Sequence, residues 1–208
     1  DYLHYLADPR KEEATMYVNN TYRQQEVYLS MANRVTVLPF WDINLSVDYQ
    51  WNKLNANLTD FPYPRRNTTL VAAATSLHFD RFKFQASVLG TFVHENVASD
   101  TTSAGNKMEF TPTAIASYKP FKNIDLSLRA FYKRIFRMPT LNDLYYTFIG
   151  NIKLKPEYTN QYNIGFTYQK LFTGTWLQAL NVQLDAYYNE VENKIIATPT
   201  NNFFRWTM

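Results

Sequence analysis

The chain has 208 residues, enough for one domain or for a section of a larger one. Aromatic residues make up 17% of it and charged residues only 19%, whereas soluble proteins typically carry about 25% charged residues. The net charge of +3 is small and unclustered, which argues against nucleic acid as a partner. There is no cysteine, which excludes disulfides and cysteine-based metal sites, and the five glycines form no phosphate-binding loop.

Hydropathy excludes membrane-spanning helices without excluding a membrane protein. The mean hydropathy is −0.39, and no run of about 18 apolar residues occurs. In a membrane β-barrel, however, lipid-facing and lumen-facing residues alternate along each strand, so that the mean hydropathy stays low. Abundant aromatic residues, few charges and a low mean hydropathy together favour such a barrel.

The first predicted strands follow a poorly patterned start. Residues 1–20 show no alternation and are interpreted as the tail of an extracellular loop. In residues 41–52 every odd position is apolar and every even position is polar, which predicts a strand with two unlike faces. Trp41 and Trp51 end the apolar face, ten positions apart. A tilted strand needs about 9–11 residues to cross a membrane, and aromatic residues at both ends are typical of the two interfaces.

The same period of two predicts seven further strands in chain order. Their alternating stretches are Val27–Met31, Val71–Phe79, Phe82–Phe92, Ala114–Tyr118, Ile124–Tyr132, Tyr162–Tyr168 and Val182–Tyr188, and a ninth strand is expected to begin at Phe203. Short connections (38–40, 80–81, 119–123 and 170–178) alternate with long ones (53–69, 95–109, 136–157 and 190–202). Short turns at one end and long loops at the other are typical of outer-membrane barrels, with the short turns in the periplasm.

The predicted fold class is therefore all-β: an antiparallel transmembrane β-barrel segment of about eight strands. A soluble β-sandwich or barrel stays open as an alternative, since its strands also alternate, with the apolar face in a core. The length of the strands and the aromatic residues at their ends favour the membrane.

The loop from Phe136 to Glu157 resembles the signature stretch of TonB-dependent outer-membrane receptors. An Arg-x-Pro element is followed by a Leu-Tyr pair, by Gly-Asn-x-x-Leu-Lys-Pro-Glu and by a strand that begins Tyr-Asn-Ile-Gly at Tyr162. The residues that carry the motif are Arg137, Pro139, Leu144, Tyr145, Gly150, Asn151, Leu154, Pro156 and Glu157. The sequence as a whole resembles Bacteroidetes-type receptors for siderophores or vitamin B12.

The resemblance implies that residues 1–208 belong to one barrel domain of about 22 strands, with the plug domain and the C-terminal strands outside this chain. Both ends of the chain are interpreted as cut points. The implied function is active import of a scarce nutrient complex, such as a siderophore or a corrinoid, across the bacterial outer membrane. The implied partners are outer-membrane lipid and lipopolysaccharide, the nutrient complex, and TonB through the plug. No cofactor is expected.

Other functions stay open in the order of their support. A passive porin or an adhesin would also be an outer-membrane barrel, and a soluble β-rich ligand-binding module comes next. An enzyme comes last, because no nucleophile motif is visible. The three histidines, His4, His78 and His94, have no metal-ligand spacing, and residues 138–150 lack the histidine that some haem receptors of the family carry there.

The signature loop is expected to be mainly structural. Its two prolines stop strands, and its Gly-Asn pair forms turns. Its aromatic residues are expected to pack on the inner wall of the barrel or on one another. The predicted ligand-contacting residues are Phe61, Tyr63, Arg65, Arg66, Tyr146 and Phe148. The Arg65-Arg66 pair, placed in a long extracellular loop, could bind an anionic ligand or lipopolysaccharide phosphates through bidentate bonds, or be a solvated charge pair.

Overall fold

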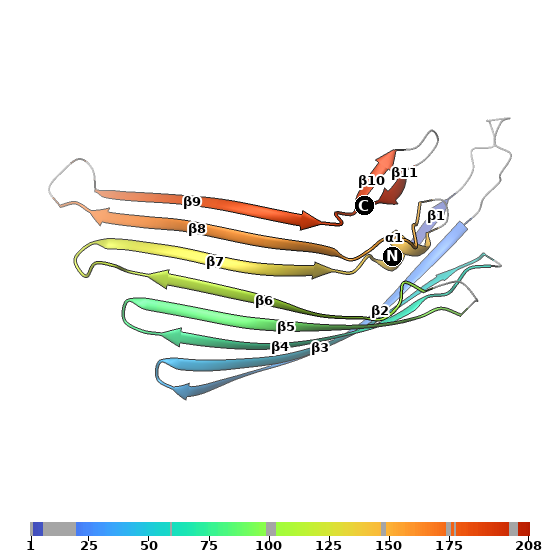
Figure 1. The fold of residues 1–208 in the computed structure, drawn as a ribbon, viewed down its shortest axis with the longest axis horizontal. Coiled ribbons are helices and arrows are strands. Elements are labelled where there is room, and N and C mark those ends of the chain that lie inside the picture. The colour runs from blue at the N-terminus through green and yellow to red at the C-terminus, as the bar shows by residue number, and fades with distance from the viewer. Residues whose placement is uncertain are drawn as a thin grey trace.

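The computed structural model describes residues 2–5, 20–58, 60–98, 103–146, 149–173, 176, 178–199 and 204–208. Most of them form one antiparallel sheet of nine strands, which lie side by side in sequence order (Figure 1). The strands are β1 (Tyr2–Tyr5), β2 (Asn20–Leu38), β3 (Trp41–Ala56), β4 (Arg65–His78), β5 (Phe82–Asn96), β6 (Lys107–Tyr118), β7 (Asp125–Arg137), β8 (Glu157–Leu171) and β9 (Ala179–Glu192). No pairing among the described residues joins β9 back to β1, so the sheet is an open, curved section.

We call strands β2–β9 the wall. They are between 12 and 19 residues long, which exceeds the about 9–11 residues that cross a bilayer. Each of the eight predicted strands falls on one of them, and short turns gather at one end with longer connections at the other (Figure 1). The strands extend further than predicted toward the long-connection end, so that the first long connection is only 57–64.

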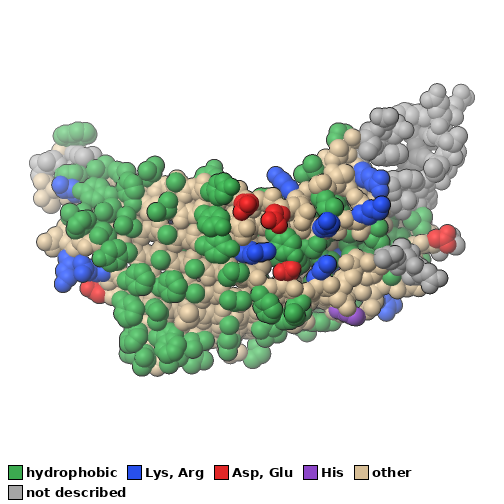
Figure 2. Space-filling view, viewed as in Figure 1, with side chains coloured by type: hydrophobic (Ala, Val, Ile, Leu, Met, Phe, Trp, Pro, Cys, Tyr) green, Lys and Arg blue, Asp and Glu red, His purple; other side chains and the backbone are tan. Residues whose placement is uncertain are grey.

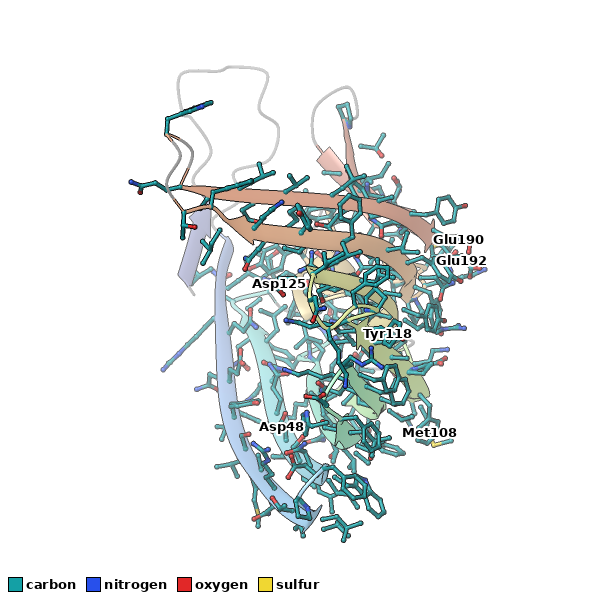
Figure 3. The ribbon with its side chains drawn as sticks, turned by 90° about the vertical axis from the view of Figure 1, so that its left-hand side faces the viewer. Asp48, Met108, Tyr118, Asp125, Glu190 and Glu192 are labelled. Atoms are coloured by element: carbon teal, nitrogen blue, oxygen red, sulfur yellow. The ribbon has the colours of Figure 1, made fainter. Side chains whose placement is uncertain are left out.

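The register of the wall separates two kinds of surface. Val47 lies opposite Met31 and Val71, whereas its neighbour Asp48 lies opposite Ser30 and Leu70. Residues directly opposite each other on neighbouring strands lie on the same face of the sheet. The apolar positions of all strands therefore form one continuous surface, and the polar positions form the other. Figure 3 shows Asp48 and Asp125 inside the curve of the sheet and Met108 on its outer side.

The convex face is apolar and exposed. Leu29, Leu45 and Ile164 have exposed fractions of 63%, 53% and 67%. Soluble proteins seldom expose apolar surface over such an area, whereas a lipid-facing wall must do so. In Figure 2, charged side chains lie near the short-turn end and toward the long-connection end, and apolar side chains fill the surface between them.

The concave face is polar along most of the wall. Four aspartates that the alternation places there all have polar partners on the same face. The pairs are Asp42 with Arg34 at 2.6 Å, Asp48 with Ser30 at 2.5 Å, Asp125 with Lys119 at 2.9 Å, and Asp185 with Arg129 at 3.1 Å. This arrangement fits the prediction of a water-facing lumen better than that of a buried soluble core.

Both ends of the chain differ from the sequence prediction. The strand expected from Phe203 is present as β11 (Phe204–Thr207), but it forms a separate hairpin with β10 (Ile196–Pro199) instead of extending the wall. At the other end, β1 pairs with residues 20–23 of β2, although residues 1–20 were expected to be loop. No helix in the described part of the chain is long and apolar enough to span a membrane.

Candidate functional site at the long-connection end

The longest described connection, between β7 and β8, folds over the concave face. Its short helix α1 (Leu141–Tyr145) was not predicted, although the sequence holds the signal for it. Thr140 accepts a hydrogen bond from the Asp143 amide at 3.1 Å, and Asp143 accepts one from the Thr140 amide at 2.9 Å. This reciprocal capping box satisfies two of the amides that a helix start leaves free, so the helix begins at Leu141, directly after its N-cap Thr140.

Helix α1 buries one side in a small apolar core, which we call the mouth cluster. Leu141, Leu144 and Tyr145 are three and four positions apart and therefore share a face of the helix. The cluster combines residues from β2, β3, three connections and the helix. Its members are Tyr22, Leu54, Phe61, Leu141, Leu144, Tyr145, Tyr146, Leu154 and Ile195, all with exposed fractions of 8% or less.

Aromatic rings join the β3–β4 connection to the cluster. The ring centroids of Tyr22 and Tyr146 are 4.5 Å apart, and those of Tyr22 and Phe61 are 5.9 Å apart. Tyr63 packs edge-on against Phe61 at 5.4 Å, and its hydroxyl donates to the carbonyls of Ala56 and Leu58. Tyr145 and Tyr146 of the signature loop thus pack on the inner side of the wall, as expected, whereas Phe136 belongs to β7 and packs against Tyr158.

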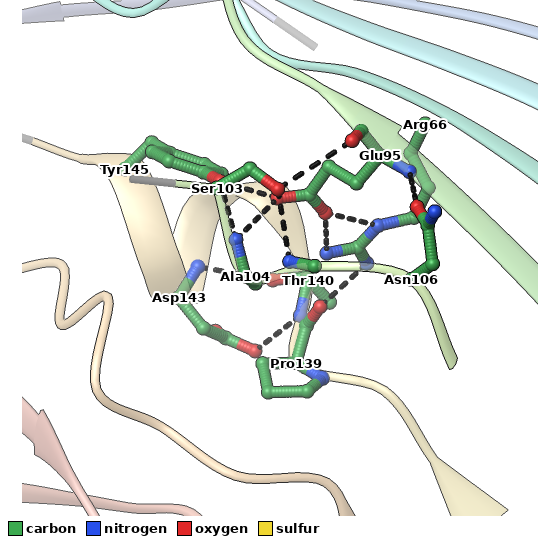
Figure 4. A network of polar contacts seen from close by, with 10 residues as sticks. Arg66, Glu95, Ser103, Ala104, Asn106, Pro139, Thr140, Asp143 and Tyr145 are labelled. Atoms are coloured by element: carbon green, nitrogen blue, oxygen red, sulfur yellow. Dashed lines mark hydrogen bonds and ion pairs between the residues drawn. The ribbon is translucent and has the colours of Figure 1, made fainter. Parts of the chain in front are cut away.

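A buried carboxylate, Glu95, holds the polar part of the site (Figure 4). Arg66 donates to its Oε2 from Nε at 2.8 Å and from Nη2 at 2.5 Å, and to the Pro139 carbonyl from Nη1 at 2.6 Å. Tyr145 donates its hydroxyl proton to the other carboxylate oxygen of Glu95. One carboxylate therefore connects β4, β5 and the signature loop.

The β5–β6 connection is bound to the same carboxylate. The Ala104 amide donates to Oε1 of Glu95 at 3.2 Å, and the Ser103 hydroxyl donates to the Glu95 carbonyl at 3.4 Å. The Glu95 amide donates to Asn106 at 3.2 Å. Three long connections thus meet on the concave side, with the β5–β6 and β7–β8 connections joined through Glu95 (Figure 4).

The electrostatics of this network follow from its burial. Arg66 and Glu95 are exposed by only 6% and 4%, so that each charge depends on the other for its solvation. The pKa of Tyr145 is raised, first by burial, then by its hydrogen bond to Glu95 and by the carboxylate charge. The Tyr145 hydroxyl is therefore fixed as a donor at any ordinary pH.

Gly150 and Asn151 of the motif close the end of α1. A Cβ on Gly150 would lie 2.6 Å from the Tyr146 carbonyl oxygen and 2.8 Å from that of Leu144, so only glycine fits. The backbone amide of Asn151 donates to the backbone carbonyl of Asp143 at 2.8 Å, and its side chain donates to the Trp206 carbonyl at 3.0 Å. The motif thereby also holds the β10–β11 hairpin.

The remaining motif residues anchor the loop to β7 and to the segment before β10. Arg137 lies 3.8 Å from the carboxylates of both Asp143 and Glu157. Glu157 accepts a hydrogen bond from the Ile195 amide at 3.1 Å, and the Pro156 carbonyl accepts one from Asn193 at 3.3 Å. Pro139 and Leu154 are buried. These contacts support the expectation that the motif is mainly structural, which stays a prediction.

The residues predicted to contact ligand are dispersed. Phe61, Arg66 and Tyr146 are buried within the site, whereas the alternation in β4 puts Arg65 on the convex face. The pair does not lie in a loop as expected but begins β4. Phe148 lies outside the described residues. Direct ligand contact by the six residues stays a prediction.

Sequence reasoning missed Glu95 and the capping pair Thr140 and Asp143. The Thr-x-x-Asp spacing was a visible signal for the cap. For Glu95 the sequence held only a weak signal, which is that an acidic residue stands near the end of a predicted strand. His78 and His94 lie at opposite ends of the paired strands β4 and β5. Among the described residues no group of three or more histidine, aspartate or glutamate side chains could hold a metal ion.

Comparison with known proteins shows which family this chain belongs to. Residues 5–207 match the family model described as TonB dependent receptor-like, beta-barrel. The chain belongs to the TonB-dependent receptor β-barrel family. Membership of a receptor family agrees with the prediction that the chain is not an enzyme.

The proteins that this chain resembles are named as transporters or receptors of different substrates. The chain is 35% identical over 72 residues to the vitamin B12 transporter BtuB of Vibrio vulnificus, an alignment that covers 35% of this chain and 11% of that protein. The copper transporter OprC shares the fold with a TM-score of 0.69 at 16% identity over 96% of this chain and 34% of its own.

Two further solved structures share the fold. One is a double mutant of the Serratia marcescens hemophore receptor HasR in complex with its hemophore HasA and heme (TM-score 0.65, 13% identity, 90% of this chain and 37% of that one). The other is the FrpB iron transporter from Neisseria meningitidis (TM-score 0.65, 12% identity, 92% and 32%). The chain thus spans about a third of the length of these solved structures.

Proposed function

We propose that the chain forms part of the wall and the extracellular mouth of an outer-membrane active transporter that imports a scarce nutrient complex, such as a siderophore or a corrinoid. Energy comes from TonB, which acts through a plug domain of the whole protein. The observation that carries the proposal is the family match over residues 5–207. The transporters named among the relatives support the general function, and the 35% identity to a vitamin B12 transporter makes corrinoids the first substrates to test.

The two surfaces of the wall support an outer-membrane location. The convex face exposes apolar side chains such as Leu29 and Ile164, whose burial in water-free lipid stabilises the barrel. The concave face carries aspartates paired with cations and hydroxyls, which suits a water-filled or plug-filled interior. With the short turns in the periplasm, the mouth cluster lies at the extracellular side.

The mouth cluster supports a receptor rather than an open pore. The β7–β8 connection folds inward over the concave face, where Arg66 and Tyr145 hold it on Glu95. Such a rigid platform keeps long connections in place for ligand capture, which lowers the entropy cost of binding. A passive porin would need this part of the lumen to stay open.

The test is uptake by cells that carry the whole receptor. Cells with the receptor gene deleted and cells complemented with it are compared for uptake of labelled cyanocobalamin, and then of ferric siderophores, each with and without functional TonB. We expect uptake of one of these complexes to require both the receptor and TonB. Uptake that persists without TonB would instead identify a passive barrel, and no receptor-dependent uptake of any nutrient complex would refute the proposal.

A further inference from the structure

The wall has one incomplete joint, which lies between β6 and β7 at the long-connection end. β6 pairs with β5 along its whole length, but it pairs with β7 only from Thr113 to Tyr118. Residues 107–112 of β6 and 134–137 of β7 are all described, and no pairing joins these two stretches (Figure 1). The ladder stops next to Pro112, which has no amide hydrogen to donate. We call the two unpaired stretches the seam.

The seam lies beyond the expected edge of the hydrocarbon. Tyr132, Tyr162 and Tyr188 follow one another across β7, β8 and β9 on the convex face, with ring centroids 5.1 and 6.2 Å apart. A row of tyrosines is typical of a membrane interface, and the seam begins at Arg134, just beyond Tyr132. Free backbone groups are excluded from lipid, whereas water can satisfy them. The ladder can therefore open and close at this level.

One hydrogen bond crosses the seam. The Tyr158 hydroxyl of β8 donates to Oε1 of Glu109 on β6 at 2.6 Å. The two residues belong to opposite faces of the wall by alternation, because Tyr158 lies opposite Phe136 on the convex face and Glu109 lies opposite Thr91 on the concave face. A continuous ladder between β6 and β7 would keep these faces apart. The bond therefore depends on the open seam.

The open seam leaves two arginines poorly paired. Arg134 lies over the Tyr158 ring, 5.2 Å from its centroid, and its Nε is buried without a hydrogen-bond partner in the described part of the chain. Arg137 approaches its two carboxylates only to 3.8 Å. If the existing β6–β7 register continued into the seam, Glu109 would lie directly opposite Arg137. Both residues belong to the concave face, and opposite charges in this position stabilise a sheet.

We propose that the seam is a gate with two states, of which this structure shows the open one. In the closed state the ladder continues past Pro112, and Glu109 exchanges Tyr158 for Arg137 of the signature motif. The missing amide of Pro112 keeps the closed ladder weak, so that the seam can open again.

Closure would change the shape of the lumen below the mouth cluster. The Glu95 network holds the β7–β8 connection on β5, so closure moves the long-connection ends of β7–β9 toward β6 beneath it. The lumen narrows there and encloses a nutrient that the mouth has received. This role rests on the proposed function, whereas the two states of the seam do not.

The first test is a disulfide that forms only in the closed state, in the whole receptor reconstituted in phospholipid vesicles. The Cβ atoms of directly opposite residues lie about 4.5–5.5 Å apart, close to the about 3.5–4.5 Å of a disulfide. E109C/R137C should therefore cross-link under mild oxidation. The positive control is T113C/K133C, a pair that already lies opposite, and the negative control is K107C/R137C, which is out of register by two residues. No cross-link in E109C/R137C, or equal cross-linking of K107C/R137C, would overturn the gate.

A second measurement keeps Glu109 in place, because E109C itself removes the bond to Tyr158. In Tyr158→Phe the open state loses that bond, so hydrogen exchange in residues 107–111 should slow by up to about tenfold. Adding Arg137→Gln removes the partner of the closed state and should reverse the slowing. The matched control is Tyr162→Phe, which changes another tyrosine of the convex face. Unchanged exchange in Tyr158→Phe, or equal slowing in Tyr162→Phe, would refute the two states.

Nutrient uptake separates the gate from the proposed function. Cells with oxidised E109C/R137C should take up far less nutrient than the same cells after reduction of the disulfide, because the closed seam cannot reopen. Equal uptake by both forms would overturn the role of the seam as a gate. If the unmodified receptor shows no TonB-dependent uptake, the transport proposal fails instead, and the cross-link, which needs no nutrient, still tests the seam.

Discussion

The wall and the mouth cluster are held together in different ways. In the wall, partners lie on strands that are next to each other or one strand apart: Ser30 and Asp48 lie on β2 and β3, and Arg129 and Asp185 lie on β7 and β9. In the Glu95 network beside the mouth cluster, by contrast, β4 and β5 contact the distant β7–β8 connection: Arg66 contacts Pro139 across 73 residues, and Tyr145 contacts Glu95 across 50. Local alternation and short turns therefore specify the wall, whereas the mouth depends on the correct arrangement of the wall before its own contacts can form.

The two regions also differ in what covers their apolar side chains. The convex face of the wall exposes apolar side chains, which lipid would cover under the proposed function. The mouth cluster hides its apolar side chains under its own loops, as a small soluble protein does, and it buries a charge pair among them. Substitutions that affect one region should therefore leave the other nearly intact, and this expectation can be tested.

The largest effect is expected for Glu95→Ala. Removal of this carboxylate leaves Arg66 as an uncompensated buried charge, and it removes the acceptor of the Tyr145 hydroxyl and one of the two acceptors of the Ala104 amide. Breaking a buried pair in this way costs about 3–5 kcal/mol. Hydrogen exchange of the amides in residues 138–146 should accelerate accordingly, while the amides in the middle of β3 and β4 keep their protection.

The control for this change is Asp185→Ala, which breaks the pair with Arg129 on the concave face of the wall. Arg129 is 42% exposed, so the loss should stay below about 1 kcal/mol. Similar losses for Glu95→Ala and Asp185→Ala, or exchange that accelerates equally in wall and mouth, would show that the two regions are not independent.

The next largest effect is expected in the wall, for Val47→Lys. Val47 lies halfway between Trp41 and Trp51 on the convex face and is 48% exposed there. A lysine at the middle of the bilayer costs about 2–4 kcal/mol. The free energy of unfolding of the whole receptor in phospholipid vesicles, from urea titration, should fall by that amount, without faster exchange in residues 138–146.

The adjacent substitution Ser46→Lys is the matched control, because Ser46 faces the concave side opposite Ala32 and Ala72. It should change the free energy of unfolding far less than Val47→Lys. Equal losses at the two neighbouring positions would contradict the assignment of the convex face to lipid.

The same contrast explains how much of the molecule the sequence could predict. The eight strands of the wall were predictable because each carries its own two-residue period, as Trp41–Asn52 does, and because neighbours in sequence become neighbours in space. The signature motif also indicated the loop that packs into the mouth cluster. The ends of the strands were predicted too short, because beyond the bilayer the pattern fades: Leu54 breaks the polar face to join the mouth cluster.

The contacts of the mouth could not be predicted from any local pattern. Nothing near Glu95 in the sequence indicates that Arg66 and Tyr145 meet there, since these residues come from β4, β5 and the β7–β8 connection. The adjacent arginines looked alike, yet the alternation of β4 sends Arg66 into a buried pair and Arg65 to the convex surface. The start of β4 at Arg65 decides between these roles, whereas the pair was expected in a loop, with the alternation beginning only at Val71.

The smallest effect is expected for Tyr145→Phe, and it carries a pH signature. Loss of one hydrogen bond to the charged carboxylate of Glu95 should weaken the mouth by about 1.5–3 kcal/mol at pH 8. The pKa of Tyr145 is raised in the folded protein by burial and by Glu95, so its contribution to stability is complete below about pH 10 and is lost as the pH rises toward the folded pKa.

Hydrogen exchange in residues 138–146, corrected for its intrinsic dependence on pH, can therefore separate the hydroxyl from the ring. In the unmodified receptor the protection of these amides should fall as the pH rises above about 10, and in Tyr145→Phe this part of the fall should be missing, because phenylalanine does not titrate. The other tyrosines are common to both proteins, so that the difference between them reports Tyr145 alone. An identical fall in both would mean that the loop opens by a route that leaves the bond between Tyr145 and Glu95 intact, and that Glu95 holds the mouth through Arg66 alone.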